Sequence, residues 1–380
     1  MRVIIAPDSF KGSLSSVQSC DIIEAGIREV FPDVVGIKIP VADGGEGTID
    51  AIRAATACDI VSETVTGPLG QPVRAEYAIL PDKTAFIEMA AASGLLLVEA
   101  GKQDPLKTTT YGTGELIASA LDHGCRKIII GLGGSATNDG GIGMAQALGY
   151  GFKDASGDEL GYGGGELGKL KTIDPSGRDR RIDECEFIVA SDVRNPLCGD
   201  TGASVVYAPQ KGACPETVRI LDGNLRHFAR IIKEAIQSDI IEAPGAGAAG
   251  GLGGGLIAFC HAAVERGIDI ILDLMEFDEK LPAADLVITG EGRMDHQTAF
   301  GKVPVGIAKR AKRLQKPVIA FTGAIGAGAS DLYSLGIDSI VSIVNKPMSL
   351  EEAMDNAEYL LKDAVVRTMR LIDMSVNARG

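Results

Sequence analysis

A glycine-dense turn between a predicted strand and a predicted helix constrains the fold more than any other stretch of the chain. Residues 128–149 read IIIGLGGSATNDGGIGMAQALG. The three isoleucines predict a buried strand, because β-branched residues favour strands and the run is too short for a helix. After Gly141 the residues have the pattern of a helix that ends at Gly149.

Such a turn is suited to binding an anion. Backbone N–H groups and the positive end of a helix dipole attract negative charge at the start of a helix. Glycine lets the backbone approach a phosphate closely and adopt positive φ. A tight turn without a ligand is the alternative, but six glycines interrupted by Ser135, Thr137, Asn138 and Asp139 exceed what such a turn needs. We therefore favour an anion-binding loop.

Length and charge limit the class of protein. The 380 residues exceed the roughly 250–300 at which a single core stops growing, which predicts two domains. The net charge of −14 argues against nucleic acid or an anionic membrane as a partner. The seven cysteines form no C-x-x-C pair and the four histidines have no metal-binding spacing, so we expect a reduced, cytoplasmic protein without a zinc site. No signal peptide or membrane span is expected.

Strands and helices alternate at both ends of the chain, which is typical of a parallel βαβ layer. The middle differs, with an antiparallel hairpin, a glycine-rich helix start and a long amphipathic helix. We predict an α/β fold: a doubly wound parallel-sheet domain built from residues 1–66 and 285–380, with residues 67–284 inserted as a second, α+β domain. The predicted strands are 2–6, 34–39, 60–66, 73–80, 84–89, 128–130, 187–190, 285–289, 317–321 and 338–344. The main middle helices are predicted at 112–123, 140–149 and 215–238, and the glycine-rich stretch Gly245–Gly255 opens another helix that runs to Arg266.

Polar, glycine-rich loops follow the carboxyl ends of predicted strands, after residues 6, 39, 130, 190, 289 and 321. The loops at the opposite edge, such as 31–33 and 123–126, are short and plain. In open α/β sheets, ligands bind at the carboxyl edge. We therefore expect a site in a cleft between the two domains.

Three segments contain candidate catalytic or binding residues. Arg293 follows a strand and could grip a carboxylate or phosphate with two donors; a solvated turn with an internal Arg–Asp pair is the alternative. Lys11 stands among hydroxyls and glycine, which suits phosphate contact, and serine capping of a helix could coexist with it. Asp192, at a strand end, is a candidate general base, with a turn role as the alternative.

Two motif matches carry little weight. Gly245–Gly250, GAGAAG, fits the dinucleotide pattern but follows a helix and a proline rather than a strand. Gly163–Lys169 fits the start of a Walker loop, but Leu170 replaces the Ser or Thr that would bind magnesium. An NAD-linked dehydrogenase of a small hydroxy acid, which depends on GAGAAG, and a non-enzymatic two-domain ligand-binding protein remain the alternative functions.

Six ordered motifs along almost the whole chain resemble the glycerate kinases of the bacterial tartronate-semialdehyde type. They are APDSFKGSLS at 6–15, PVADGGEGT at 40–48, GLGGSATNDGGIGMAQALG at 131–149, DVRNPLCG at 192–199, GAGAAGGLGGGL at 245–256 and DLVITGEGRMDHQTAFGKVPVGIA at 285–308. The resemblance implies two α/β domains with the active site between them. It also implies phosphorylation of D-glycerate by ATP and Mg²⁺, with 2-phosphoglycerate favoured over 3-phosphoglycerate.

Phosphoryl transfer needs positioning, charge neutralisation and a carboxylate that takes the hydroxyl proton. Within the resemblance we assign Asp192 as the base, Lys11 as a catalytic phosphate ligand and Arg293 as the ligand of the glycerate carboxylate. The residues expected to bind phosphate or nucleotide are Ser9, Gly133, Gly134, Ser135, Thr137, Asn138, Gly251 and Lys302. The carboxylates expected to orient the substrate or hold magnesium, in roles they could exchange, are Asp8, Asp43, Glu46, Asp139, Glu291 and Asp295.

Overall fold

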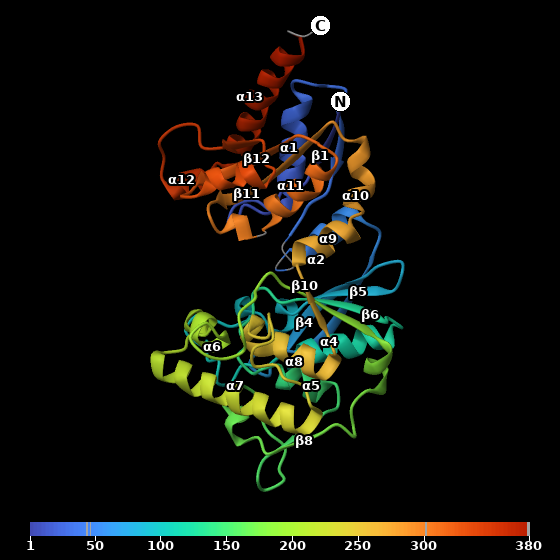
Figure 1. Ribbon diagram of the computed structural model, residues 1–380, viewed down its shortest axis with the longest axis vertical. Helices are drawn as coiled ribbons and strands as arrows, with labels where there is room; N and C mark the ends of the chain where they lie inside the picture. The colour runs from blue at the N-terminus through green and yellow to red at the C-terminus, as the bar shows by residue number, and fades with distance from the viewer. Residues whose placement is uncertain (43–44, 46, 301, 378–380) are drawn as a thin grey trace. The chain divides into compact units, whose positions relative to one another are not determined.

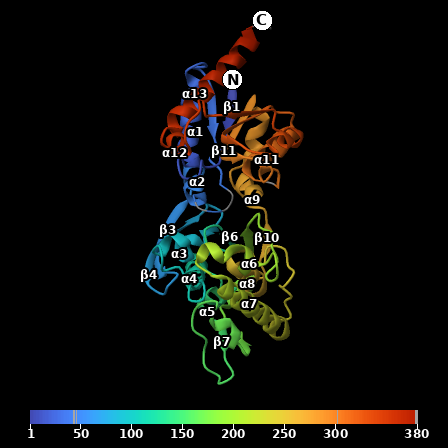
Figure 2. The same cartoon turned by 90° about the vertical axis from the view of Figure 1, so that its left-hand side faces the viewer.

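The computed structural model describes residues 1–42, 45, 47–300 and 302–377. The chain divides into two compact units, the first comprising Met1–Asp43, Asp50–Thr56 and Ile268–Gly380 and the second Gly44–Ile49 and Ala57–Gly267. Both ends of the chain belong to the first unit (Figure 1, Figure 2). The predicted domain boundaries at 66/67 and 284/285 differ from these, because the strand before residue 67 joins the second unit and the helices before 285 join the first.

The first unit contains a five-stranded sheet in which every pair of neighbours is parallel. The chain runs from β1 to β2 on one side of the sheet and from β11 through β12 to β13 on the other. β1 and β11 are therefore adjacent at a topological switch point, where open α/β sheets bind ligands. The predicted doubly wound parallel sheet from both chain ends is confirmed. Its strands, in spatial order, are β13 (Ser339–Ser342), β12 (Val318–Ile325), β11 (Leu286–Met294), β1 (Arg2–Ile5) and β2 (Val35–Lys38).

Helices from the two chain ends cover this sheet together. α1 (Ser16–Arg28) and α13 (Ala357–Asn377) lie side by side (Figure 1), and Gly26 of α1 allows a close approach to Val365 of α13. Ser15 caps α1 through a capping box with Gln18, as the serines before this helix predict. The other helices of this part are α2 (Thr48–Ala55), α9 (Gly267–Leu274), α10 (Phe277–Lys280), α11 (Val303–Arg313) and α12 (Leu350–Asp355).

The second unit contains a six-stranded mixed sheet. β5, β6, β9 and β10 are parallel, and β4 runs antiparallel to both β3 and β5. The predicted hairpin of 73–80 and 84–89 is confirmed as β4 and β5. The strands, in spatial order, are β10 (Ala263–Glu265), β9 (Glu186–Ala190), β6 (Lys127–Gly131), β5 (Thr84–Glu88), β4 (Pro72–Ile79) and β3 (Asp59–Thr66).

The placement of residues 60–66 in the parallel layer was wrong. β3 pairs antiparallel with β4 along its whole length, from Asp59 opposite Ile79 to Thr66 opposite Pro72. The N–H of Gly67 donates to the carbonyl of Gln71 at 2.6 Å and closes a tight turn. A short turn brings sequential strands together, so the local antiparallel pairing replaces a distant parallel one.

Helices and a small hairpin complete the second unit. α7, predicted over 215–238, is confirmed, whereas the helix expected to reach Arg266 ends at Cys260, because His261 adopts a left-handed φ of 55°. The α-helices and the small hairpin are α3 (Ala90–Ser93), α4 (Tyr111–Asp122), α5 (Ile142–Ala147), α6 (Ala203–Tyr207), α7 (Pro215–Ile236), α8 (Leu252–Cys260), β7 (Gly151–Lys153) and β8 (Thr172–Asp174). Among the described residues of both units, the 3₁₀ helices are η1 (Leu95–Leu97), η2 (Glu166–Lys169), η3 (Arg180–Glu184), η4 (Pro209–Lys211), η5 (Ala248–Gly251), η6 (Leu281–Ala283), η7 (Thr298–Phe300) and η8 (Ala329–Leu335).

The seven cysteines are free thiols. In the described part of the chain, no helix combines the length and apolar character needed to cross a membrane.

Candidate active site

The predicted site residues fall into two groups, one in each unit. Asp43 and Glu46 lie outside the described residues. The first unit contains Asp8, Ser9, Lys11, Glu291, Arg293, Asp295 and Lys302, and the second contains Gly133, Gly134, Ser135, Thr137, Asn138, Asp139, Asp192 and Gly251.

The first group lies at the carboxyl ends of β1 and β11. The N–H of Asp8 donates to the carbonyl of Gly290 at 2.8 Å, and the Asp8 carboxylate accepts the N–H of Ser9 at 2.6 Å. The loop predicted after residue 289 is a strand instead: β11 continues to Met294 beside β12. A Cβ on Gly290 would lie 2.4 Å from the Phe321 carbonyl, so glycine permits this close pairing. Glu291 and Arg293 are therefore held on a sheet rather than on a loop.

Glu291 is the buried carboxylate of this group. It accepts a hydrogen bond from Thr298 Oγ1 at 2.6 Å, and Lys302 Nζ lies 3.9 Å away. Burial raises the pKa of the Glu291 carboxyl, opposed by the Thr298 hydrogen bond and by the charges of Lys302 and Lys11. These contacts bring Glu291, Lys302 and Lys11 into one electrostatic cluster.

Arg293 and Asp295 form the internal ion pair that was the alternative to substrate binding. Arg293 Nε lies 3.0 Å from the Asp295 carboxylate, which also accepts the N–H of Gln297 at 2.9 Å. The Gln297 and Arg293 hydrogen bonds lower the pKa of Asp295. The Arg293 side chain is nonetheless 68% exposed. Because the ion pair uses Nε, the two terminal nitrogens of Arg293 remain available to a carboxylate or phosphate.

The glycine-dense turn of the second unit joins β6 to α5 as predicted. Gly134 adopts a φ of 75°, and its carbonyl accepts the N–H of Leu95 at 2.8 Å. The backbone of Gly133 packs against Gly45, where a Cβ would lie 2.7 Å from its Cα. Two motifs distant in sequence thus meet at this turn. Within residues 131–141 only Gly133 and Gly134 are exposed.

The polar side chains that follow in this turn point into the protein. Thr137, Asn138 and Asp139 are fully buried. The Asp139 carboxylate accepts the N–H and the hydroxyl of Thr110, both at 2.8 Å, and burial raises its pKa. Asn138 Nδ2 donates to Ser204 Oγ at 3.0 Å. These contacts hold the buried side of the turn in place. The roles of Thr137, Asn138 and Asp139 in binding ligands stay predictions.

Lys211 is a buried charged residue at this turn that the sequence reasoning missed. Its Nζ donates to Ser135 Oγ and to the carbonyl of Thr137, each at 2.7 Å, and the residue is 1% exposed. Burial lowers its pKa to about 7, although the charge of Asp139 opposes the shift. The surrounding sequence, PQKGACP, predicts an exposed turn, and lysine is seldom fully buried, so no local signal marks it.

Asp192 lies at the carboxyl edge of the same sheet. The N–H of Ser191 donates to the Glu265 carbonyl and joins the ends of β9 and β10. Arg266, which follows β10, brings its Nε to 3.9 Å from Asp192 Oδ1. The hydroxyl of Ser191 accepts the N–H of Val193 in the following turn. Asp192 is thus a partly exposed carboxylate held beside an arginine, a geometry open to a base role.

The dinucleotide-like segment Gly245–Gly250 is a packing element. It is buried, and the N–H of Gly140 donates to the carbonyl of Gly250 at 3.1 Å. A Cβ on Gly250 would lie 1.9 Å from the Thr137 carbonyl, and one on Gly251 would lie 2.9 Å from Gly140 Cα. The glycines here let this segment support the turn from below. The predicted nucleotide contact of Gly251 therefore falls on a buried backbone.

The Walker-like match is a chance resemblance. Residues 163–169 follow no strand, and Lys169 pairs with Glu166 at 2.7 Å.

The carboxylates of the first unit could hold magnesium together with the phosphates of a substrate. The residues that the structure describes contain no cluster of three or more His, Cys, Asp or Glu arranged to hold a metal. Magnesium is commonly held by one or two carboxylates and by substrate phosphates. The oxygen donors of Asp8, Glu291 and Asp295 therefore suit an ion that arrives with a nucleotide.

Comparisons with known proteins point to one family. The model of the Glycerate kinase family matches residues 3–373. A glycerate kinase of Bacillus subtilis is 51% identical over 366 residues, covering 96% of both chains. A glycerate 2-kinase of Escherichia coli is 51% identical over 358 residues, covering 94% of both chains. A crystal structure of a putative glycerate kinase 2 from Salmonella typhimurium aligns with a TM-score of 0.89 at 48% identity, covering 99% of both chains.

Proposed function

The chain belongs to the glycerate kinase family, and we propose that it transfers the terminal phosphoryl group of ATP to the 2-hydroxyl of D-glycerate. The observation that carries the choice of hydroxyl is the 51% identity to a glycerate 2-kinase across 94% of both chains. The dehydrogenase alternative loses its basis, because its motif is a buried packing segment.

Each group of residues has a role in this reaction. Asp192 accepts the proton of the attacking hydroxyl, which makes the oxygen a better nucleophile. The N–H groups of Gly133 and Gly134 and the Ser135 hydroxyl bind phosphate oxygens, since the two glycines are the exposed residues of the turn and Ser135 adjoins them. Arg293 holds the glycerate carboxylate through its terminal nitrogens.

Lysines and carboxylates of the first unit handle the charge of the nucleotide. Lys11 and Lys302 provide point charges for phosphate oxygens. Asp8, Glu291 and Asp295 are the residues that would hold magnesium, and the ion supplies neutralisation of phosphate charge when bound. Exposure of Lys11 and the strand position of Glu291 support these assignments.

Phosphorus NMR of the product tests the choice of hydroxyl. A phosphate on carbon 2 couples to one proton and gives a doublet, whereas a phosphate on carbon 3 couples to two and gives a triplet. We expect the doublet when the protein is incubated with D-glycerate, ATP and magnesium. A triplet would assign the product as 3-phosphoglycerate.

Thermal unfolding tests the cofactor. A ligand at about 100 times its dissociation constant adds about 2.7 kcal/mol to the stability of the folded state. ATP with magnesium should therefore raise the melting temperature, and NAD should leave it unchanged. A shift with NAD and none with ATP would contradict the kinase proposal, and omission of magnesium in a third sample shows whether the ion contributes to nucleotide binding.

A further inference from the structure

A buried ammonium group beneath the glycine-dense turn has no role in the reaction as described so far. Lys211 lies at the end of η4, between two prolines at 209 and 215, and its long side chain reaches the turn more than seventy residues away in sequence. Taking a lysine out of water is costly unless its donors are satisfied. Both hydrogen bonds of Lys211 go to this one turn. The free energy needed to bury the lysine is therefore offset only when the turn has the conformation that accepts these bonds.

Lys211 holds the turn from outside it. In the described part of the chain, Thr137 Oγ1 and Asn138 Oδ1 find no hydrogen-bond partner among the protein atoms. Lys211 Nζ, by contrast, donates to Ser135 Oγ and to the Thr137 carbonyl. These two bonds tie residues 135 and 137 of the turn to the segment that carries Lys211.

The bond from Lys211 also sets the direction of the Ser135 hydroxyl. Lys211 Nζ donates this hydrogen bond, so the Ser135 oxygen accepts it and the Ser135 hydroxyl proton points elsewhere. Ser135 is 8% exposed and adjoins the two exposed glycines. Its O–H and the neighbouring N–H groups are thereby available as donors to the same anion.

We propose that Lys211 is a positioning residue of the kinase, which acts through Ser135 and the Thr137 carbonyl to keep residues 133–138 in the form that binds the phosphates of ATP. The inference rests on the proposed role of this turn in phosphate binding. The charge of Asp139 also acts on Lys211, but its carboxylate accepts hydrogen bonds from Thr110 and from the N–H groups of Gly141 and Gly143, and the Lys211 hydrogen bonds go to the turn instead.

A double-mutant cycle tests this. Lys211→Met keeps most of the side-chain volume but removes the donor, and Ser135→Ala removes the hydroxyl. Hydrogen bonds to charged groups contribute enough that each single variant should raise the KM for ATP by about ten-fold or more, with a much smaller change in the KM for D-glycerate. If Lys211 acts through Ser135, the double variant should bind ATP little worse than either single variant.

Controls separate positioning from a general structural role. Lys233→Met removes an exposed lysine of the same unit, paired with Asp239 at 2.6 Å, and should leave the KM for ATP unchanged. Ser135→Thr restores a hydroxyl and should recover part of the ATP affinity lost in Ser135→Ala. A parental KM for ATP in folded Lys211→Met, or effects that multiply in the double variant, would overturn the proposal.

Two further outcomes are distinguishable. If Lys211→Met does not fold, Lys211→Arg takes its place: it keeps a donor but changes its length and shape, so a parental KM for ATP in folded Lys211→Arg together with an unchanged KM in Ser135→Ala would overturn the proposal. If the parent protein itself fails to phosphorylate glycerate, the proposed function fails, whereas normal parental turnover with unaffected variants overturns only the role of Lys211.

Discussion

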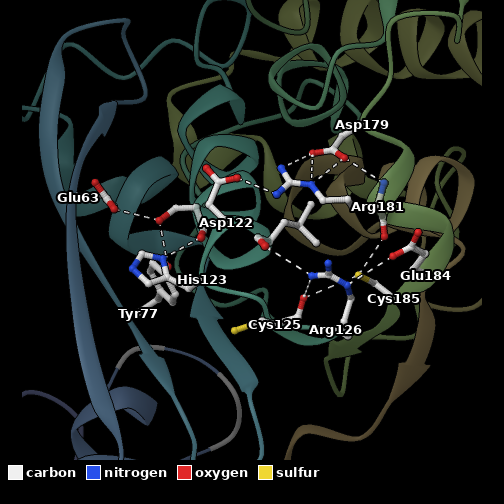
Figure 3. A network of polar contacts seen from close by, with 12 residues as sticks. Glu63, Tyr77, Asp122, His123, Cys125, Arg126, Asp179, Arg181, Glu184 and Cys185 are labelled. Carbon is white, nitrogen blue, oxygen red and sulfur yellow. Dashed lines mark hydrogen bonds and ion pairs between the residues drawn. The ribbon is translucent and has the colours of Figure 1, made fainter.

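The two edges of the sheet in the second unit differ in how they use charge. At the amino edge, before β6 and β9, Arg181 pairs with Asp179 and Asp122, and Arg126 lies 3.7 Å from Glu184 (Figure 3). At the carboxyl edge the polar groups are the glycine turn, Asp192 and the buried Lys211. Exposed, mutually paired charges contribute little to stability, whereas buried donors and fixed backbone can act on a ligand. The amino edge is thus a surface of paired, exposed charges, whereas the carboxyl edge carries the groups to which the proposed function assigns roles.

The largest effect of one substitution is expected at the carboxyl edge, for Asp192→Asn. The amide keeps the shape of the side chain and removes its charge, and loss of a general base typically lowers the rate by ~10²–10⁴-fold. Steady-state kinetics should show kcat falling within that range, with the melting temperature and the KM for ATP little changed. Asp295→Asn is the control for a magnesium role and should raise the magnesium requirement. Lower stability with normal turnover would favour a turn role for Asp192.

The pH dependence of stability separates the buried lysine from the exposed charges. The folded-state pKa of Lys211 is lowered to about 7, while an unfolded lysine titrates near 10.4. Between these values the unfolded chain binds more protons, so this residue makes the free energy of unfolding rise with pH. The stability difference between the parent and Lys211→Met should therefore grow by on the order of 4 kcal/mol from pH 7 to 10.

Denaturant unfolding across this pH range measures that difference. Burial raises the pKa values of Cys20, Cys198 and Cys260, so these thiols make the free energy of unfolding fall as the pH rises. Their contribution is the same in the parent and in the variant, and it cancels in the difference between the two. Lys233→Met, measured in parallel, controls for the loss of one positive charge. A difference that stays flat or falls with pH would mean that Lys211 remains protonated in the folded protein.

Arg293 extends the comparison to the carboxyl edge of the other sheet. Loss of a charge-assisted contact to the glycerate carboxylate should raise the KM for D-glycerate about 10- to 100-fold in Arg293→Met, with a small effect on stability because the side chain is largely exposed. Arg293→Lys keeps the charge but loses the planar fork, so it should recover only part of the affinity. An unchanged KM for D-glycerate would leave Arg293 as the partner of Asp295 alone.

The smallest effect is expected at the amino edge. Arg181→Ala removes ion pairs with two carboxylates at 2.6 and 2.7 Å, yet all three side chains are partly or largely exposed, so the loss should be about 1 kcal/mol or less. Denaturant unfolding measures this, and the kinetic constants should equal those of the parent. An altered KM for ATP or D-glycerate would contradict the expectation that the amino edge of the sheet takes no part in substrate binding.

Much of the architecture could be predicted from local sequence properties. The isoleucine run before the turn and the β-branched strands at both ends define the two sheets, and α7 follows from its amphipathic pattern. The sequence does not show that Arg126, in the short loop at residues 123–126, lies beside Glu184, because that partner is distant in the chain. Asp8, Glu291 and the glycine turn were predicted as site residues because each follows a strand predicted from the sequence, although Glu291 lies within β11.

The sequence alone determined the main strands and helices and the family. It did so through the period of its side chains, its β-branched residues, the φ freedom of glycine and the six family motifs. Tertiary structure decided the rest: the extension of β11 through Arg293, the antiparallel pairing of β3, and the inward direction of Thr137 and Asn138. Lys211 illustrates the physical reason. Its neighbours in sequence predict a solvated turn, and only packing against residues 74 and 76 positions away removes it from water and aims its ammonium group at the turn.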